Sequence, residues 1–297
     1  MDKIGHRSVF IAGMNRGCRM DAPRASRTMV LLGCMLLLLQ LPLALWAFDG
    51  AMDRAADELI AAAGNHRLIV IGETHGTRET PAFVGAVARS YADRGPLLLA
   101  LEVDQDEHAI LKRYMSGPGD RLRHEMRQRE AWNVPSERND GRRSEDMLDL
   151  IEAMRALRAT GHDVAIFPFD TGRWTRGSES RDAAMAMNLR NAYRALPETG
   201  RLLVLTGNVH AMAFKPVYCP QCQTPMTSYL SDLAPFTVRI DALEGQYWAC
   251  RGGHCGPSEV RTGNASIGRN EVTSDTPYHY WLVLPRFSPA RLIDPSG

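Results

Sequence analysis

The chain has 297 residues, enough for one large or two small domains and for a substantial buried core. Its 35 basic and 34 acidic side chains leave a formal net charge of +1, so its net charge gives no electrostatic attraction to nucleic acid. The composition therefore argues against a basic nucleic-acid-binding protein. We expect the partner to be a small-molecule or peptide substrate.

Residues 1–47 are typical of an export segment. An apolar stretch at 29–47 ends in small residues, contains Pro42, and is preceded by five arginines: Arg7, Arg16, Arg19, Arg24 and Arg27. This pattern predicts a secretory signal peptide cleaved after Ala47. The alternative is an uncleaved inner-membrane anchor, because about 19 apolar residues just suffice to cross a bilayer. In both cases residues 48–297 are predicted to form a single exported domain, periplasmic or secreted, with membrane contact only through the N-terminal segment.

Behind this segment, short apolar runs alternate with amphipathic stretches. Strands are predicted at 68–72, 96–102, 164–169 and 202–206, and further strand-like runs at 236–240, 247–250 and 280–284. Helices are predicted at 51–64, 77–93, 106–129 with a break at 116–119, 144–160 and 181–196. Continuous apolar strands separated by helices predict an α/β fold, with a mostly parallel sheet covered by helices on both faces.

Four cysteines lie in the predicted domain, in a small β-hairpin insertion at about 215–260. They form two knuckles: Cys219 with Cys222, and Cys250 with Cys255. An even number of cysteines in an oxidising compartment favours two disulfides. A structural zinc site with four thiolate ligands is the alternative. A redox role for the first knuckle is a third, although that motif should open a helix and here it lies in a Pro-rich loop.

Polar side chains follow each of the first four predicted strands. They are Glu73 and His75, then Glu102, then Asp170, then Asn208 and His210. Ligands of an open parallel sheet bind beyond the carboxyl ends of its strands, so this pattern predicts a functional cluster. Each residue alone has a structural explanation, since a carboxylate can cap a helix and a lone histidine is often a core residue.

The motifs at these strand ends resemble those of erythromycin-esterase-like proteins. Gly72-Glu73-Thr74-His75-Gly76-Thr77 is similar to the family's Gly-Glu-Ala-Thr-His-Gly-Thr signature, shortened by one residue. Four later segments follow in the family's order: Ala100–Glu102, Pro168–Asp170, Arg181–Leu189 and Gly207–Ala211. The wider superfamily includes ChaN-type haem-binding, TraB and Tiki proteins. The resemblance implies an exported hydrolase of ester or amide bonds, and alternatively a haem- or iron-binding protein without catalysis.

The residues suggest two mechanisms for hydrolysis. In the first, His75 is the general base, Glu73 or Glu102 orients it, and His210 donates to the developing oxyanion. In the second, His75, Glu102 and His210 hold a divalent metal ion whose bound water is the nucleophile. Both require these three side chains to converge within a few ångströms.

Further residues are candidates for substrate binding. Asp170 and Asn208 follow strands at the same edge, and Arg78, Arg173 and Arg181 are suited to an anionic substrate group. The chain lacks a Gly-x-Ser-x-Gly elbow, which argues against a serine nucleophile.

Overall fold

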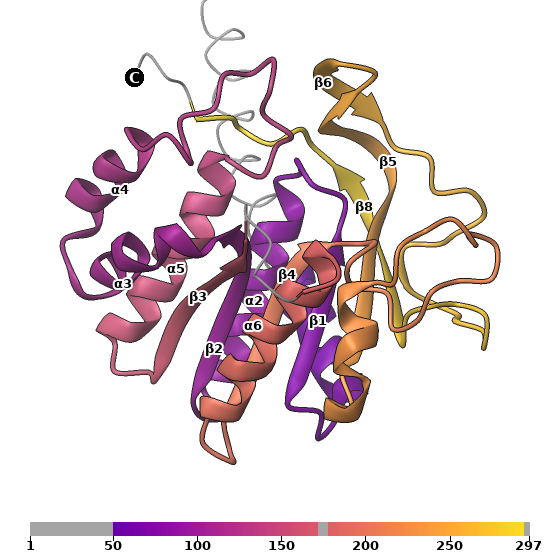
Figure 1. The fold of residues 1–297 in the computed structure, drawn as a ribbon, viewed down its shortest axis with the longest axis horizontal. Coiled ribbons are helices and arrows are strands. Elements are labelled where there is room, and N and C mark those ends of the chain that lie inside the picture. Colours follow the sequence, from indigo (N-terminus) through magenta and orange to yellow (C-terminus); the bar gives the residue numbers. More distant parts are fainter. Residues whose placement is uncertain (1–49, 172–177, 294–297) are drawn as a thin grey trace, which may run out of the picture. The chain divides into compact units, whose positions relative to one another are not determined.

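One sheet organises the protein, which is described by a computed structural model (Figure 1). Its strand order is β3-β2-β4-β1-β5-β8-β7, with β6 paired to β5 beside this path. The four strands predicted first are β1 (Leu68–Glu73), β2 (Leu97–Asp104), β3 (Val164–Asp170) and β4 (Arg201–Gly207), and they pair in parallel. β5 (Phe236–Arg251) and β8 (Tyr280–Phe287) extend the parallel part. β6 (His254–Glu259) and β7 (Gly268–Asn270) are antiparallel.

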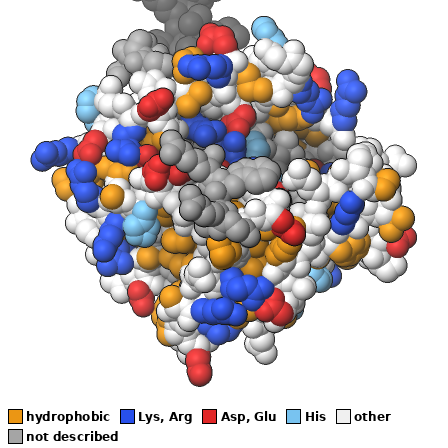
Figure 2. Space-filling view, in the orientation of Figure 1, with side chains coloured by type: hydrophobic (Ala, Val, Ile, Leu, Met, Phe, Trp, Pro, Cys, Tyr) orange, Lys and Arg blue, Asp and Glu red, His pale blue; other side chains and the backbone are white. Residues whose placement is uncertain are grey.

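Residues 50–171 and 178–293 are described. The predicted export segment and Arg173 lie outside them. The described residues belong to one compact unit. None of the helices in the two described ranges has the length and apolar character needed to cross a membrane. On the face drawn in Figure 2, basic and acidic side chains are interspersed.

Apolar cores lie on both faces of the sheet. In β1, Ile69 and Ile71 belong to one core, whereas Leu68 and Val70 belong to the other. Successive side chains of a strand point to opposite faces, so a strand buried on both sides needs the continuous apolar run seen in the sequence. Each such side chain contributes about 1.5–3 kcal/mol on burial. The predicted α/β class is confirmed.

The helices cover both faces of this sheet. A helix occupies residues 50–63, and the others are α2 (Glu79–Ala92), α3 (His108–Ser116), α4 (Gly119–Arg127), α5 (Glu145–Ala159) and α6 (Arg181–Ala195). Short 3-10 turns occur at η1 (Gln105–Glu107) and η2 (Met226–Leu233). α2 packs into one core and α6 into the other (Figure 1). Ser180 caps α6 by accepting from Ala183 N at 3.1 Å, which fixes Arg181 in the first turn.

The cysteine hairpin is continuous with the main sheet. The sequence predicted separate runs at 236–240 and 247–250, but β5 is one strand of 16 residues. Its first part pairs with β1 and β8, and its last part pairs with β6. Glu244 and Gly245 interrupt the apolar pattern and imitate a turn, although their backbone still pairs with β8. Pairing of the backbone, which the side-chain pattern does not report, keeps the strand unbroken.

Both cysteine knuckles are closed as disulfides. Cys219 is bonded to Cys222, and Cys250 to Cys255 across the β5–β6 hairpin. The disulfide prediction is confirmed. The alternative of a four-thiolate zinc site is wrong, because zinc requires thiolates and these sulfurs are bonded to each other. Two disulfides indicate an oxidising environment.

Candidate functional site

The first part of the site is a carboxylate–imidazole pair at the end of β1. His75 Nδ1 lies 2.9 Å from Glu73 Oε1, and Glu73 is buried whereas the ring is partly exposed. The turn that follows needs glycine at Gly76, where φ is +77° and an added Cβ would lie 2.0 Å from Trp248 O. This turn therefore fixes the direction in which the His75 ring leaves the strand.

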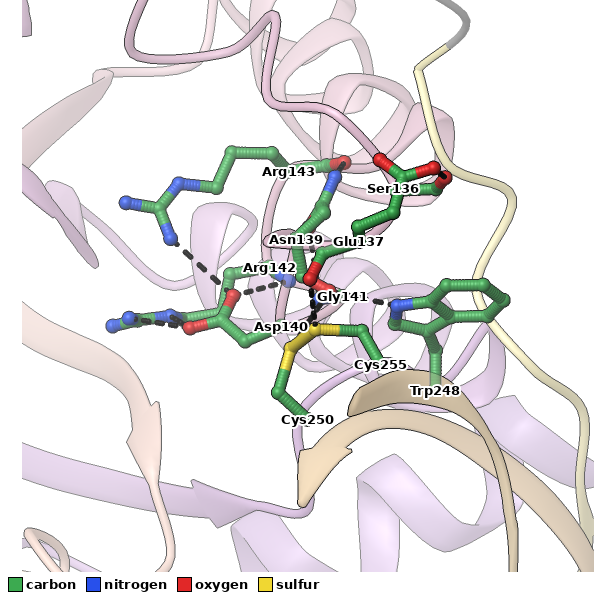
Figure 3. The surroundings of a disulfide bond; sticks show 10 residues. All are labelled: Ser136, Glu137, Asn139, Asp140, Gly141, Arg142, Arg143, Trp248, Cys250 and Cys255. Atoms are coloured by element: carbon green, nitrogen blue, oxygen red, sulfur yellow. Dashed lines mark hydrogen bonds and ion pairs between the residues drawn. A yellow bond between two sulfur atoms is a disulfide. The ribbon is translucent and has the colours of Figure 1, made fainter. Parts of the chain in front are cut away.

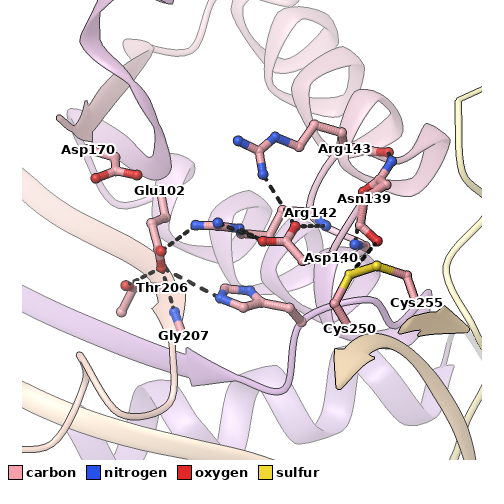
Figure 4. Close-up of polar contacts among 12 residues, drawn as sticks. Glu102, Asn139, Asp140, Arg142, Arg143, Asp170, Thr206, Gly207, Cys250 and Cys255 are labelled. Carbon is pink, nitrogen blue, oxygen red and sulfur yellow. Dashed lines mark hydrogen bonds and ion pairs between the residues drawn. A yellow bond between two sulfur atoms is a disulfide. The ribbon is translucent and has the colours of Figure 1, made fainter. Parts of the chain in front are cut away.

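Glu102 is the buried centre of the site (Figure 4). Its Oε2 accepts from Thr206 Oγ1 at 2.7 Å and from Gly207 N at 2.8 Å. Its Oε1 accepts from Arg142 Nη1 at 2.5 Å and Arg181 Nη2 at 2.9 Å. Burial alone would raise the pKa of this carboxyl, but neighbouring cationic groups, including both arginines, hold the pKa below its usual value. Glu102 is therefore a permanent anion that binds β2 to β4, α6 and the loop at 139–143.

His210 belongs to a second carboxylate–imidazole pair. Its Nδ1 lies 2.7 Å from Asp182 Oδ1, and its Nε2 lies 3.2 Å from Arg181 Nη1. A guanidinium group has only donors, so Nε2 accepts this bond and Nδ1 carries the proton donated to Asp182. Sequence reasoning missed Asp182, although it stands beside Arg181 in the motif that begins α6.

The three side chains on which the sequence argument depended come together. His75 Nε2 is 3.8 Å from Glu102 Oε2, and His210 Nε2 is 3.9 Å from Glu102 Oε1. Gly207 permits this approach, because a Cβ there would lie 2.8 Å from His75 Nε2 and 3.5 Å from His210 Cδ2. The segment Gly207–His210 thus supplies His210, and its glycine leaves the space that the His75 ring occupies.

Charges around His75 oppose each other. Burial lowers the pKa of its imidazole, and Arg142 acts in the same direction. The hydrogen bond to Glu73 and the negative charges of Glu102 and Glu73 outweigh them, so the pKa is raised above 6.5. His75 can therefore take a proton near neutral pH and be stabilised once it is charged.

A loop that the sequence gave no reason to select supplies two more charged groups. Arg142 donates to Asp140 Oδ2 from Nε at 2.9 Å and from Nη2 at 2.6 Å. Burial would raise the pKa of Asp140, but Arg142 and other cations lower it to about 2. Asn139, fully buried, shapes the loop through its bonds to Arg143 O and Gly141 N. An ion pair within an irregular loop has no periodicity, so the sequence pattern does not reveal it.

The disulfide hairpin packs on this loop (Figure 3). Trp248 Nε1 donates to Asn139 O at 2.7 Å, and Cys250 Sγ lies 3.3 Å from the same oxygen. Cys255 Sγ lies 2.9 Å from Glu137 O. The hairpin, which the sequence predicted as a small insertion, is thus in direct contact with the loop that carries Arg142.

A cavity of about 400 Å³ opens where these parts meet. It is lined by strand-end residues, by one loop residue and by the hairpin: Glu73, Thr74, His75, Asp140, Gly207, Asn208, Val209, His210 and Tyr247 to Arg251. Its volume suits a small-molecule ligand. The hairpin and the two histidines therefore line the same cavity.

The donor set does not fit a divalent metal ion. Both oxygens of Glu102 are engaged by donors, two of them guanidinium groups that would repel a cation. His210 Nε2 already accepts from Arg181. Over residues 50–171 and 178–293, His, Cys, Asp and Glu side chains form no group of three or more that could hold a metal. The mechanism proposed below therefore uses no metal ion.

The other predicted residues have varied places. Asp170 holds Arg181 through two bonds, of 2.9 Å and 2.7 Å, and so positions that guanidinium group. Asn208 lines the cavity, and its backbone joins Glu73 O to the Tyr278 hydroxyl. Arg78 is not at the site: it is exposed at the start of α2 and donates to Pro289 O at 2.9 Å.

Solved structures share this architecture at low sequence identity. A mutant of the erythromycin esterase EreC in its open conformation is 10% identical, with a TM-score of 0.57 over 80% of this chain and 95% of that chain. A Bacillus cereus protein is 11% identical, with a TM-score of 0.55 over 79% of this chain and 92% of that one. The chain has an erythromycin-esterase-like fold.

Other comparisons add little. ChaN of Campylobacter jejuni, described as binding haem cofacially, is 9% identical. The match covers 70% of this chain and 92% of that chain, and its TM-score of 0.33 is too low to show a shared fold. No protein-family model and no curated protein matches the sequence. The solved structures establish the fold alone, so the function must be argued from the site.

Proposed function

We propose that the protein is an exported hydrolase of an ester or amide bond, with His75 as its general base. The supporting observation is the 2.9 Å bond between His75 Nδ1 and Glu73 Oε1 at the wall of the cavity. With Nδ1 donating to Glu73, Nε2 is the nitrogen that accepts a proton. EreC, an esterase with the same fold, makes this reaction class plausible for the site.

The reaction begins when His75 Nε2 removes a proton from a water molecule in the cavity. The water oxygen bonds to the substrate carbonyl carbon, and Glu73 stabilises the imidazolium that forms. As the bond to the leaving group breaks, the imidazolium returns the proton to that group. His75 therefore acts first as base and then as acid.

The developing oxyanion needs donors on the opposite side. We expected His210 to provide one, but its Nε2 accepts a bond instead of donating. Arg181 donates to His210 Nε2 from beside the cavity lining, and its side chain is 30% exposed. We assign the stabilisation of the oxyanion to the charge of its guanidinium group. Asp170 and Glu102 position Arg181, and Asp182 positions His210.

The test uses the full chain produced in an oxidising compartment. It is screened against 4-nitrophenyl esters and anilides, with and without chelator. We expect turnover that chelator does not change, and a fall in kcat of about 10²–10⁴-fold in His75→Ala. His124→Ala, in an exposed position on α4, is the matched control and should keep wild-type rates. Absence of turnover by the wild type, or full turnover by His75→Ala, would overturn the proposal.

Haem binding, the alternative implied by the resemblance, has weaker support. Of the two histidines, His210 is poorly placed to bind haem iron, because its Nε2 already accepts from Arg181. A Soret shift on haem addition that is lost in His75→Ala and His210→Ala would favour this alternative. Export itself is proposed from residues 29–47 and agrees with the two disulfides.

A further inference from the structure

A second, smaller cavity lies beside the one at the histidines. Its volume is about 170 Å³, and it shares Thr74, Asn208, Tyr247 and Arg251 with the first cavity. Its remaining lining comes from β5, from the end of β6 and the three residues that follow it, and from the last residue of β8: Arg239, Asp241, residues 259–262 and Phe287. The four shared residues make the two cavities direct neighbours.

One of the three arginines in the second cavity is held in place. Arg239 Nε donates to Asp241 Oδ2 at 2.6 Å, and this carboxylate also accepts from Trp281 Nε1 at 2.8 Å. The Arg239 guanidinium lies 5.9 Å from the Tyr278 ring centroid and 5.8 Å from that of Trp281. Arg239 is therefore oriented by its neighbours, and its charge is matched by Asp241.

The other two arginines lack such a match. Among the described residues, neither Arg251 nor Arg261 forms an ion pair with a carboxylate. Arg251 donates to the Tyr247 hydroxyl and lies 5.6 Å from the centroid of that ring. Glu259, the remaining acid of the cavity, accepts instead from Gln246 Nε2 at 2.7 Å. The lining thus holds three arginines against two carboxylates, Asp241 and Glu259, so it has a net positive charge.

We infer that this second cavity binds an anionic group of the substrate, a carboxylate or a phosphate, through Arg251 and Arg261. Guanidinium groups form strong charge-assisted bonds with both kinds of anion. The inference rests on the proposed function and sharpens it: the substrates are esters or amides with a negative charge at the end remote from the bond that is cleaved. Neutral substrates of the same length leave the two arginines unpaired.

Two measurements test this inference, one of rate and one of binding. Mono-4-nitrophenyl glutarate and 4-nitrophenyl pentanoate have acyl chains of equal length, and only the first ends in a carboxylate. We expect the glutarate ester to have the higher kcat/KM. The double variant R251Q/R261Q should lose about tenfold or more of this preference, the loss expected when a charge-assisted hydrogen bond is removed.

Binding is measured by calorimetric titration with glutarate and, separately, with inorganic phosphate, which distinguishes the two anions. Arg286→Gln, an exposed β8 position outside both cavities, is the matched control and should bind as the wild type does. Binding of either anion that R251Q/R261Q loses supports the subsite even if no ester is cleaved, so failure of the hydrolase proposal remains distinguishable. Equal binding of both anions by the variant and the wild type, or no binding at all, would overturn the inference.

Discussion

The two sides of the cavity are built differently. On the strand-end side, Glu102 is buried and each of its oxygens accepts two hydrogen bonds. On the hairpin side, the cavity residue Arg251 and the nearby Glu259 are exposed, and each makes a single local hydrogen bond. The charge of Glu102 is thus paired with arginines inside the protein, whereas Arg251 has no ion pair with a carboxylate of the described residues.

This difference suggests a division of work. The strand-end side holds the reacting groups in a fixed arrangement before substrate arrives, which limits the reorganisation needed during reaction. The hairpin side shapes the cavity and, in our inference, selects the substrate. Substitutions on the two sides should therefore change different quantities.

The largest expected effect is on stability, at Glu102. Glu102→Ala removes the buried carboxylate that Arg142 and Arg181 share, and it leaves the Thr206 hydroxyl and Gly207 N without their acceptor. We expect a cost of about 3–5 kcal/mol in the free energy of unfolding. Glu259→Ala, the matched change on the hairpin side, should cost no more than about 0.5 kcal/mol. Urea unfolding measures both. Similar losses for the two variants would remove the distinction between the two sides.

The next effect is on activity, at Gly207. In Gly207→Ala the new Cβ would lie 2.8 Å from His75 Nε2, so the ring must move. Displacement of a catalytic group by about 1 Å costs roughly 100-fold in rate, and we expect a fall of that order in kcat. Gly256→Ala, in the hairpin where an added Cβ meets nothing within 4 Å, is the control. Unchanged kcat in Gly207→Ala would show that the position of His75 does not matter.

A smaller effect compares the two disulfides. The double variant C250S/C255S removes the one that contacts the Asn139 and Glu137 carbonyls, and C219S/C222S removes the other. Both close short loops, so each should cost less than about 3 kcal/mol of stability. We expect kcat/KM to fall about tenfold in the hairpin variant, because the cavity wall and the Arg142 loop shift together. C219S/C222S should leave kcat/KM unchanged, and an equal fall in both would contradict the role given to the hairpin.

The strand-end side could be predicted from the sequence because its signals are local. A buried strand such as β1 requires a continuous apolar run, and a parallel sheet brings the ends of its strands to one edge. Glu73 and Glu102 lie at or near the ends of β1 and β2, and His75 and His210 follow β1 and β4 by two and three residues. Asp182 was within reach of the same reasoning, since it begins α6 next to Arg181.

The hairpin side could not be predicted in this way. Arg142 reaches Glu102 across 40 residues, and Trp248 reaches Asn139 across 109. Such contacts depend on tertiary packing, which periodicity does not encode. The same limit explains Arg78: its charge suggested binding to an anionic substrate group, but it is not part of the cavity lining and donates to Pro289 O instead.

The pH dependence of ester hydrolysis tests the central role of His75 most directly. A general base must be deprotonated, so kcat/KM should rise with pH through an apparent pKa above 6.5, the value of an unperturbed histidine. Glu73→Gln removes a negative charge that raises this pKa, so the rise should move to lower pH. A rise that stays at the same pH in Glu73→Gln, or a rate independent of pH between about 5 and 8, would contradict the account.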